Sequence, residues 1–259
     1  MFAVNAVRHV LYISMAKSQI IILEKTDSTN KYCLAKFAEL PDSSLVIAKE
    51  QSEGRGRRGR SWMSPPGNLY ASFVIKKALT PAQNTYIGAV SAIEMLRQYA
   101  PGIPFWIKWP NDVFTKSLKI AGILSERHCP ENYNKSDGAV VGIGINLNTD
   151  KCFYEKNRLK ATSVKVETGN ENDITKFAVS LHSALIRNYG IAVKSPDLLF
   201  KAWKKENILI GRNVDIIPES GFQVTGLFRD IDKDGALVLT LPDGNTRKLY
   251  SGDVSVKFK

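Results

Sequence analysis

Four arginines occur within six residues of a glycine-rich segment, and the surrounding sequence limits what they can bind. The segment runs GRGRRG from Gly54 to Gly59, and Arg60 follows it. A GxGxxG pattern suggests a dinucleotide-binding turn, but that turn must open a helix and be followed about 20 positions later by an acidic residue. Here SWMSPPG breaks any helix, and no Asp or Glu lies between Glu53 and Glu94. We therefore interpret the segment as a mobile loop whose guanidinium groups bind phosphate or carboxylate, with a solvated loop touching nucleic acid as an equal alternative.

Three further segments combine polar side chains or glycines with predicted strands. The sequence KWPND at 108–112 places a cation, an amide and a carboxylate where a strand ends, although Pro-Asn-Asp is also a common turn and Trp109 could belong to the core. Lys119 begins an apolar strand, where its ammonium either faces an anion or is solvated. The two glycines of GIGIN at 142–146 indicate the close approach of a ligand or another backbone, or else a bulge. Each signal is weak alone.

Composition sets the wider limits. The chain has 259 residues, of which 44% are hydrophobic and 24% charged, so it is globular rather than disordered or fibrous. Its 36 Lys+Arg against 25 Asp+Glu give a net charge of +11, which favours an anionic partner such as a nucleotide, a nucleic acid or an acidic protein. Three cysteines without a CxxC motif and three histidines favour neither a disulfide framework nor a clustered metal site. No apolar run approaches the roughly 18 residues of a membrane span, so we expect a cytoplasmic protein without a membrane partner.

Hydrophobic periodicity predicts the elements that must position these residues. Strand-like runs occupy 19–24, 45–49, 69–76, 105–109, 119–125 and 139–146. Helices are predicted from Lys31 to a stop at Pro41, from the capping box at Thr80 to Pro101, from Asp173 to Asn188 with Gly190 just beyond the end, and after Ser195-Pro196. After Asn207, short alternating strands separated by glycine turns predict a small β-barrel.

This pattern predicts three parts. Residues 1–18 form an N-terminal extension that need not be native, and residues 1–14 of it lie outside the fold. Residues 19–206 form the larger domain, and residues 207–259 form the barrel.

Taken together and in order, five segments resemble the motifs of bacterial biotin protein ligases. They are TDSTN at 26–30, QSEGRGRRGRSW at 51–62, KWPND at 108–112, KIAGIL at 119–124 and GIGIN at 142–146. The tail segments at 226–239 and 251–254 are similar to the C-terminal barrel of that family, so the resemblance covers about residues 20 to 257. It implies an α+β fold: a mixed β-sheet catalytic domain with flanking helices, like class II aminoacyl-tRNA synthetases and biotin ligases, followed by a small SH3-like β-barrel.

The resemblance also implies a reaction. The biotin carboxylate attacks the α-phosphorus of ATP, which forms biotinyl-5′-AMP and releases pyrophosphate. A lysine of a biotin carboxyl carrier protein, from acetyl-CoA carboxylase or a similar carboxylase, then attacks the acyl carbonyl and releases AMP. Both steps gather negative charge in one place, which protein cations and the Mg²⁺ that accompanies ATP must balance.

The motif match implies three groups of site residues. Those expected to be catalytic are Arg57, Lys119 and Asp112. Those expected to bind biotin are Ser28, Thr29, Asn30, Gln51, Gly54, Arg55, Gly56 and Lys119. Those expected to bind ATP or the adenylate are Arg55, Arg57, Trp62, Asn68, Lys108, Asn111 and Asn146.

One departure from the family pattern, and two alternatives, bear on the function. Family members that repress transcription carry a winged-helix domain ahead of the TDSTN-like motif, and the residues before Ser28 are too few to form one. We therefore expect a monofunctional ligase, monomeric or homodimeric, with no sequence-specific DNA binding. A lipoate ligase-like adenylating acyltransferase stays open, although its members lack the GRGRRG loop. A nucleic-acid-binding module also stays open, although it gives KWPND and GIGIN no role.

Overall fold

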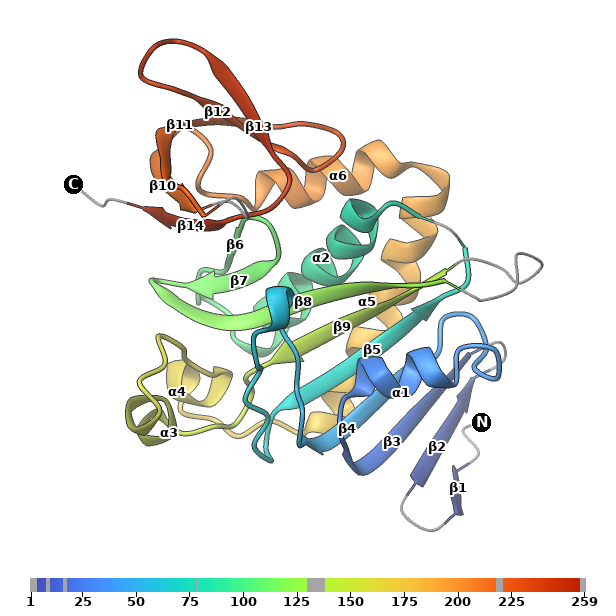
Figure 1. Ribbon diagram of the computed structural model, residues 1–259. Helices are drawn as coiled ribbons and strands as arrows, with labels where there is room; N and C mark the ends of the chain where they lie inside the picture. Colours follow the sequence, from blue (N-terminus) through green and yellow to red (C-terminus); the bar gives the residue numbers. More distant parts are fainter. Residues whose placement is uncertain are drawn as a thin grey trace.

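The computed structural model describes residues 4–7, 10–15, 18–77, 79–129, 138–217 and 221–256. Two β-sheets and the helices packed on them make up this part of the chain (Figure 1). The large sheet contains β1 (Val4–Val7), β2 (Val10–Met15), β3 (Ser18–Thr26), β4 (Leu45–Gln51), β5 (Leu69–Ile75), β6 (Trp106–Lys108), β7 (Asp112–Thr115), β8 (Leu118–His128) and β9 (Gly138–Ile145).

The large sheet is mixed, as the motif resemblance implies. Its strand order is β1-β2-β3-β4-β5-β9-β8-β7-β6. The pairing of β3 with β4 is parallel, and the other neighbouring pairs are antiparallel. The order brings β8 and β9 to the middle of the sheet beside β5, so that motifs far apart in the sequence become neighbours.

Both faces of this sheet are buried, and helices cover each of them (Figure 1). Along β3, Ile20 and Ile22 contribute to one hydrophobic cluster, and Ile21 and Leu23 to the other, because successive strand residues point to opposite faces. The first cluster includes side chains of α2 (Pro81–Tyr99), α5 (Ile174–Lys194) and α6 (Pro196–Lys205), and the second includes those of α1 (Thr29–Ala35).

Helix boundaries confirm one prediction and correct another. At the start of α2, the Thr80 hydroxyl accepts from the Gln83 amide at 3.2 Å, and the Gln83 side chain accepts from the Thr80 amide at 3.0 Å, so the predicted capping box is present. The predicted end of α5 before Gly190 is wrong, because the helix continues to Lys194. Tyr189 and Ala192 are buried in the core, and this packing outweighs the low helix propensity of one glycine. Two short helices, α3 (Lys151–Lys156) and α4 (Val164–Thr168), and strand β7 were not predicted.

The N-terminal segments add two strands to the edge of the large sheet. β2 pairs along β3, and β1 pairs with β2, so residues 4–7 and 10–15 extend the sheet; this differs from the expectation that residues 1–14 lie outside the fold, because the edge of β3 offers unpaired backbone groups. The predicted domain boundaries after residues 18 and 206 stay predictions.

A small antiparallel sheet follows α6. Its strands are β10 (Asn213–Ile217), β11 (Val224–Ile231), β12 (Leu237–Thr240), β13 (Thr246–Leu249) and β14 (Asp253–Val256). Their order in the sheet is β13-β12-β11-β10-β14. It lies beside α6 and β6 (Figure 1). The indole nitrogen of Trp109 donates to the carbonyl of Gly235 at 2.9 Å, and Phe228 belongs to the same hydrophobic cluster as Trp203 of α6, so the two sheets are packed together. Within the described residues, the two edge strands β13 and β14 do not pair with each other.

None of the helices in the described ranges is both long enough and apolar enough to cross a lipid bilayer.

Candidate active site

A cavity of about 320 Å³ lies between the N-terminus of α1, the arginine loop (Gly54–Trp62), strands β7, β8 and β9, and the small sheet. It brings together residues from each of the predicted motifs. The predicted site residues that line it are Ser28, Thr29, Asn30, Gln51, Arg55, Gly56, Arg57, Trp62, Lys108, Asn111, Asp112 and Lys119.

The floor of the cavity is made by glycines of two neighbouring strands. Gly122 of β8 lies directly opposite Gly144 of β9. A Cβ atom on Gly144 would lie 2.7 Å from Cε2 of Trp62, and one on Gly122 would lie 3.1 Å from Cζ3 of the same ring. The missing side chains therefore leave room for the Trp62 indole against the sheet. The glycines of GIGIN predict the close approach of a ligand or another backbone. In the structure, the group that approaches Gly144 is the side chain of Trp62.

The other glycine of this motif admits a second polar side chain. A Cβ atom on Gly142 would lie 2.4 Å from Oδ1 of Asn30, which is closer than real Cβ contacts come. Asn30 is 3% exposed, and its Oδ1 accepts from the Ser72 hydroxyl at 2.6 Å. The first turn of α1 is thus fixed directly against β5 and β9.

One end of the cavity is polar and uncharged. Oε1 of Gln51 accepts from the amide of Thr29 at 2.9 Å and from its hydroxyl at 3.1 Å, while Nε2 of Gln51 donates to the Ser64 hydroxyl at 2.9 Å. The hydroxyl oxygens of Ser72 and Thr29 lie 2.8 Å apart. Because buried polar groups with fixed partners keep one geometry, this end can present donors and acceptors to an uncharged polar ring.

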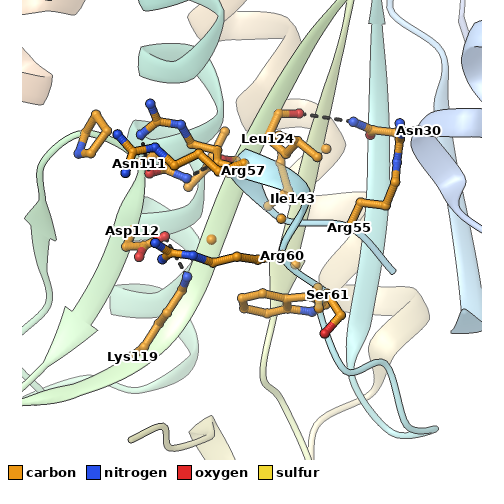
Figure 2. Close-up of a pocket in the computed structure, with 18 of the residues that line it drawn as sticks. Asn30, Arg55, Arg57, Arg60, Ser61, Asn111, Asp112, Lys119, Leu124 and Ile143 are labelled. Carbon is orange, nitrogen blue, oxygen red and sulfur yellow. Dashed lines mark hydrogen bonds and ion pairs between the residues drawn. The ribbon is translucent and has the colours of Figure 1, made fainter. Parts of the chain in front are cut away.

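The other end is cationic. Nζ of Lys119 lies 2.7 Å from Oδ1 of Asp112 and 5.0 Å from the centre of the Trp62 ring. Nη1 of Arg57 donates to Oδ1 of Asn111 at 3.1 Å, and Arg60 reaches toward Asp112 (Figure 2). Cations held by defined partners in a partly enclosed site suit a carboxylate or a phosphate.

The arginine loop is a short hairpin. The amide of Trp62 donates to the carbonyl of Gly54 at 2.8 Å, and that of Gly56 donates to the carbonyl of Arg60 at 2.7 Å. At its tip Arg58 has a φ of +58°, an uncommon conformation for a residue with a side chain. Gly54 is a packing position, since a Cβ atom there would lie 2.3 Å from the carbonyl oxygen of Trp62. It supports the loop instead of lining the cavity.

Two predicted adenylate-binding residues also lie outside the cavity lining. Oδ1 of Asn68 accepts from the amides of Leu147, Asn148 and Thr149 at 2.9, 3.2 and 3.3 Å, so this side chain holds the turn after β9. Nδ2 of Asn146 donates to the carbonyl of Thr162 at 2.9 Å. Both amides brace the structure behind the site, and contact of either with a nucleotide stays a prediction.

Sequence reasoning missed the contribution of the small sheet. Gly252 and Val254 line the cavity, and Nη2 of Arg58 lies 3.5 Å from the hydroxyl of Ser251. The only sequence signal for this wall is the SGDV segment in the tail, whose distance along the chain from the other motifs gives no hint of its position. Tyr70 also lines the cavity and lies outside every predicted motif. Other lining residues belong to the predicted motifs but were not named individually as site residues: Arg58, Arg60, Ser61, Trp109, Pro110, Gly122, Leu124 and Ile143.

Comparisons with known proteins agree with this arrangement. The family described as "Biotin/lipoate A/B protein ligase family" matches residues 22–146, and "Biotin protein ligase C terminal domain" matches residues 209–257. The chain is 35% identical to a biotin–[acetyl-CoA-carboxylase] ligase of Paracoccus denitrificans, over 86% of this chain and 95% of that protein. It is 32% identical to the bifunctional ligase/repressor BirA of Escherichia coli, over 92% of this chain and 74% of that protein. The structure of the Aquifex aeolicus biotin protein ligase in complex with biotin and ATP superposes with a TM-score of 0.78 at 27% identity, over 93% of this chain and 99% of that one.

Proposed function

The chain belongs to the biotin/lipoate A/B protein ligase family and is a biotin protein ligase, and we propose that the cavity described above is the site where biotin and ATP form biotinyl-5′-AMP and where biotin passes to a carrier-protein lysine. The observation that carries this proposal is the cavity itself. One end is polar and uncharged, the other is cationic, and the glycine floor with the Trp62 indole lies between them.

The polar end fits the ureido ring of biotin. That ring has two N–H donors and one carbonyl acceptor. Thr29 and Gln51 offer hydroxyl and amide groups within one hydrogen-bond network, and Ser28 lines the same cavity. An unpaired ureido group would cost affinity when it is buried, so these partners favour biotin over an acid with an apolar ring. The same argument disfavours lipoate, whose dithiolane ring lacks such donors.

The cationic end fits the reacting groups. When a carboxylate oxygen of biotin attacks the α-phosphorus, a C–O–P linkage forms and pyrophosphate leaves, and the negative charges of both reactants converge. Lys119 and Arg57 are the cations we assign to that charge, each held by a partner, Asp112 and Asn111. Such preorganised groups stabilise the transition state more than the ground state.

Asp112 has a second proposed role. In the transfer step a neutral lysine amine attacks the acyl carbonyl, AMP leaves, and the amine must lose a proton. Asp112 lies at the cavity wall beside Lys119, so we assign it to position the incoming amine and to accept that proton.

Magnesium enters this proposal only with ATP. Within the described residues no three His, Cys, Asp or Glu side chains cluster as ligands, and the Asp112 carboxylate is already paired with Lys119. Mg²⁺ carried on the phosphates of ATP stays a prediction, and no step above depends on it.

Two finer points belong to the same proposal. The five-stranded sheet matches the C-terminal domain of biotin protein ligases, and we propose that it is the SH3-like barrel of that domain. A biotin carboxyl carrier protein of acetyl-CoA carboxylase is the proposed partner, which the name of the Paracoccus relative supports. Monomeric or dimeric state and the lack of sequence-specific DNA binding stay predictions.

The decisive experiment incubates the protein with ATP, Mg²⁺, biotin and a biotin-carrier domain, followed by an avidin blot. Pyrophosphate exchange is measured in parallel with biotin or lipoate as the acid. We expect a labelled carrier and exchange that depends on biotin. Exchange driven by lipoate alone would favour the lipoate ligase reading, and salt-sensitive DNA binding without either activity would favour a nucleic-acid-binding module.

A further inference from the structure

Glu126, on β8, joins two segments that meet at the cavity without lining the cavity itself. Nη2 of Arg55 lies 2.5 Å from Oε1 and 2.7 Å from Oε2 of this carboxylate, and Nδ2 of Asn30 donates to Oε2 at 2.7 Å. Both Arg55 and Asn30 line the cavity (Figure 2). We propose that Glu126 is a positioning residue that holds the arginine loop against α1 and thereby keeps biotinyl-AMP enclosed; the second half of this inference rests on the proposed function.

The α1 side of this connection is rigid. Asn30 is buried, its Oδ1 accepts from the Ser72 hydroxyl of β5, and its Nδ2 also donates to the carbonyl of Leu124 at 3.2 Å. The absence of a Cβ on Gly142 lets the amide lie directly against β9. A side chain fixed from three strands gives Glu126 a fixed partner, so the carboxylate can anchor whatever binds its other oxygen.

The loop side is the part that this anchor restrains. Arg55 forms an antiparallel bridge with Ser61 at the base of the hairpin, next to the hydrogen bond between Gly54 and Trp62. Arg57 stands at the tip beyond that base. Holding Arg55 therefore fixes the place from which both Arg57 and Trp62 reach the cavity.

A carboxylate suits this position better than a neutral group. Arg57, Arg60 and Lys119 bring three positive charges to one end of the cavity, while Asp112 is the single carboxylate among the lining residues, so the described lining carries an excess of positive charge. The Glu126 side chain is 24% exposed and that of Arg55 is 41% exposed, so the pair is partly screened but holds two short contacts. Glu126 thus offsets one loop cation from outside the cavity and leaves the ligand side open.

The first test measures how fast preformed biotinyl-AMP dissociates. Because charge-assisted hydrogen bonds are lost, we expect Glu126→Ala to release the adenylate roughly tenfold faster or more. Glu126→Gln keeps an acceptor for Asn30 and should fall between. The matched control is Glu206→Ala, which removes a similar pair with Arg97, at 2.9 and 2.6 Å, and neither of these residues lines the cavity. A lower melting temperature with unchanged release would assign Glu126 a merely structural role and overturn the proposal.

A second test measures how accessible the arginine loop is to protease when no ligand is bound. Trypsin cleaves after arginine, so cleavage between Arg55 and Arg60, identified by mass spectrometry, reports how firmly the hairpin is held. We expect faster cleavage in Glu126→Ala than in the wild type or in Glu206→Ala. Equal rates in all three would refute the anchoring. If the wild type forms no biotinyl-AMP at all, the proposed function fails, while this cleavage result still decides whether Glu126 holds the loop.

A double variant completes the design. If Arg55 and Glu126 act as one unit, Arg55→Ala with Glu126→Ala should release the adenylate at the rate of Arg55→Ala alone. Multiplying effects of the two substitutions would show that Glu126 acts independently of the loop, contrary to the proposal.

Discussion

Replacing Gly144 by alanine tests the glycine floor most directly. The new Cβ would lie 2.7 Å from Cε2, 2.8 Å from Nε1 and 2.9 Å from Cζ2 of Trp62. Carbon atoms prefer separations of about 3.5–4.0 Å, so the indole would have to move away from β9 by about 1 Å. Because the indole ring is rigid and three of its atoms would be too close to the new Cβ, the whole ring has to move.

The size of the effect follows from that displacement. Overpacking by one methyl group costs about 1–3 kcal/mol, and a misplacement of about 1 Å in a catalytic arrangement can cost about 100-fold in rate. Trp62 also contacts Lys119, so the shift reaches the cation assigned to adenylation. We expect the single-turnover rate of biotinyl-AMP formation to fall by about 100-fold.

The same single-turnover rate is measured for a control variant in which another glycine is replaced by alanine. Gly190→Ala lies inside α5, and no atom other than neighbouring residues and the backbone of the same helix lies within 4 Å of the added Cβ, so it should keep the rate and stabilise the helix by up to about 1 kcal/mol. If Gly144→Ala forms the adenylate as fast as the wild type, the indole is not positioned by the floor, and the account of the cavity is wrong.

Three other outcomes are expected. Lys119→Ala should slow adenylation far more than it weakens biotin binding, measured by single-turnover kinetics and calorimetry; lost binding with a surviving rate would make Lys119 a substrate-holding residue. Arg57→Ala should speed the escape of biotinyl-AMP and label lysines of bystander proteins, and an unchanged dissociation rate would contradict this. Burial lowers the pKa of His182 below its ordinary 6.5. The neutral form is therefore favoured in the folded state, and its stability contribution is complete above about pH 6.5 and declines as the pH falls through the unfolded and then the folded pKa. Melting temperatures between pH 7 and 5 should fall more steeply for the wild type than for His182→Gln, and parallel curves would show that His182 is not responsible.

The sequence predicts most of the elements and most of the cavity, for local reasons. The capping box at Thr80 and the apolar run of β3 depend on residues close together in the sequence, so they can be identified without the fold. The motifs supply residues at strand ends and helix starts that a mixed sheet brings together. Lys119, Asp112 and Arg57 are therefore found at one site.

The missed features depend on contacts between distant segments. Gly190 is compatible with a helix end, and only the burial of Tyr189 and Ala192 shows why α5 continues. Asn68 has a side chain suitable for a ligand, yet its acceptor is used by three backbone amides nearly 80 residues away along the chain. Glu126 stands just beyond a motif, and its partners, 71 and 96 residues away in sequence, give it its role.

The wall formed by Gly252 and Val254 has a consequence for the synthesis of the protein. A ribosome makes the α1 turn, the arginine loop and Lys119 well before it makes β14, and the cavity is lined on one side by residues of that last described strand. During translation the chain therefore holds the cations that we propose to act on the biotin carboxylate before it holds the wall that we propose to shield the mixed anhydride from water. On this proposal the intermediate is fully enclosed only after β14 has folded beside the large sheet, so synthesis of the catalytic cations precedes formation of the protected site.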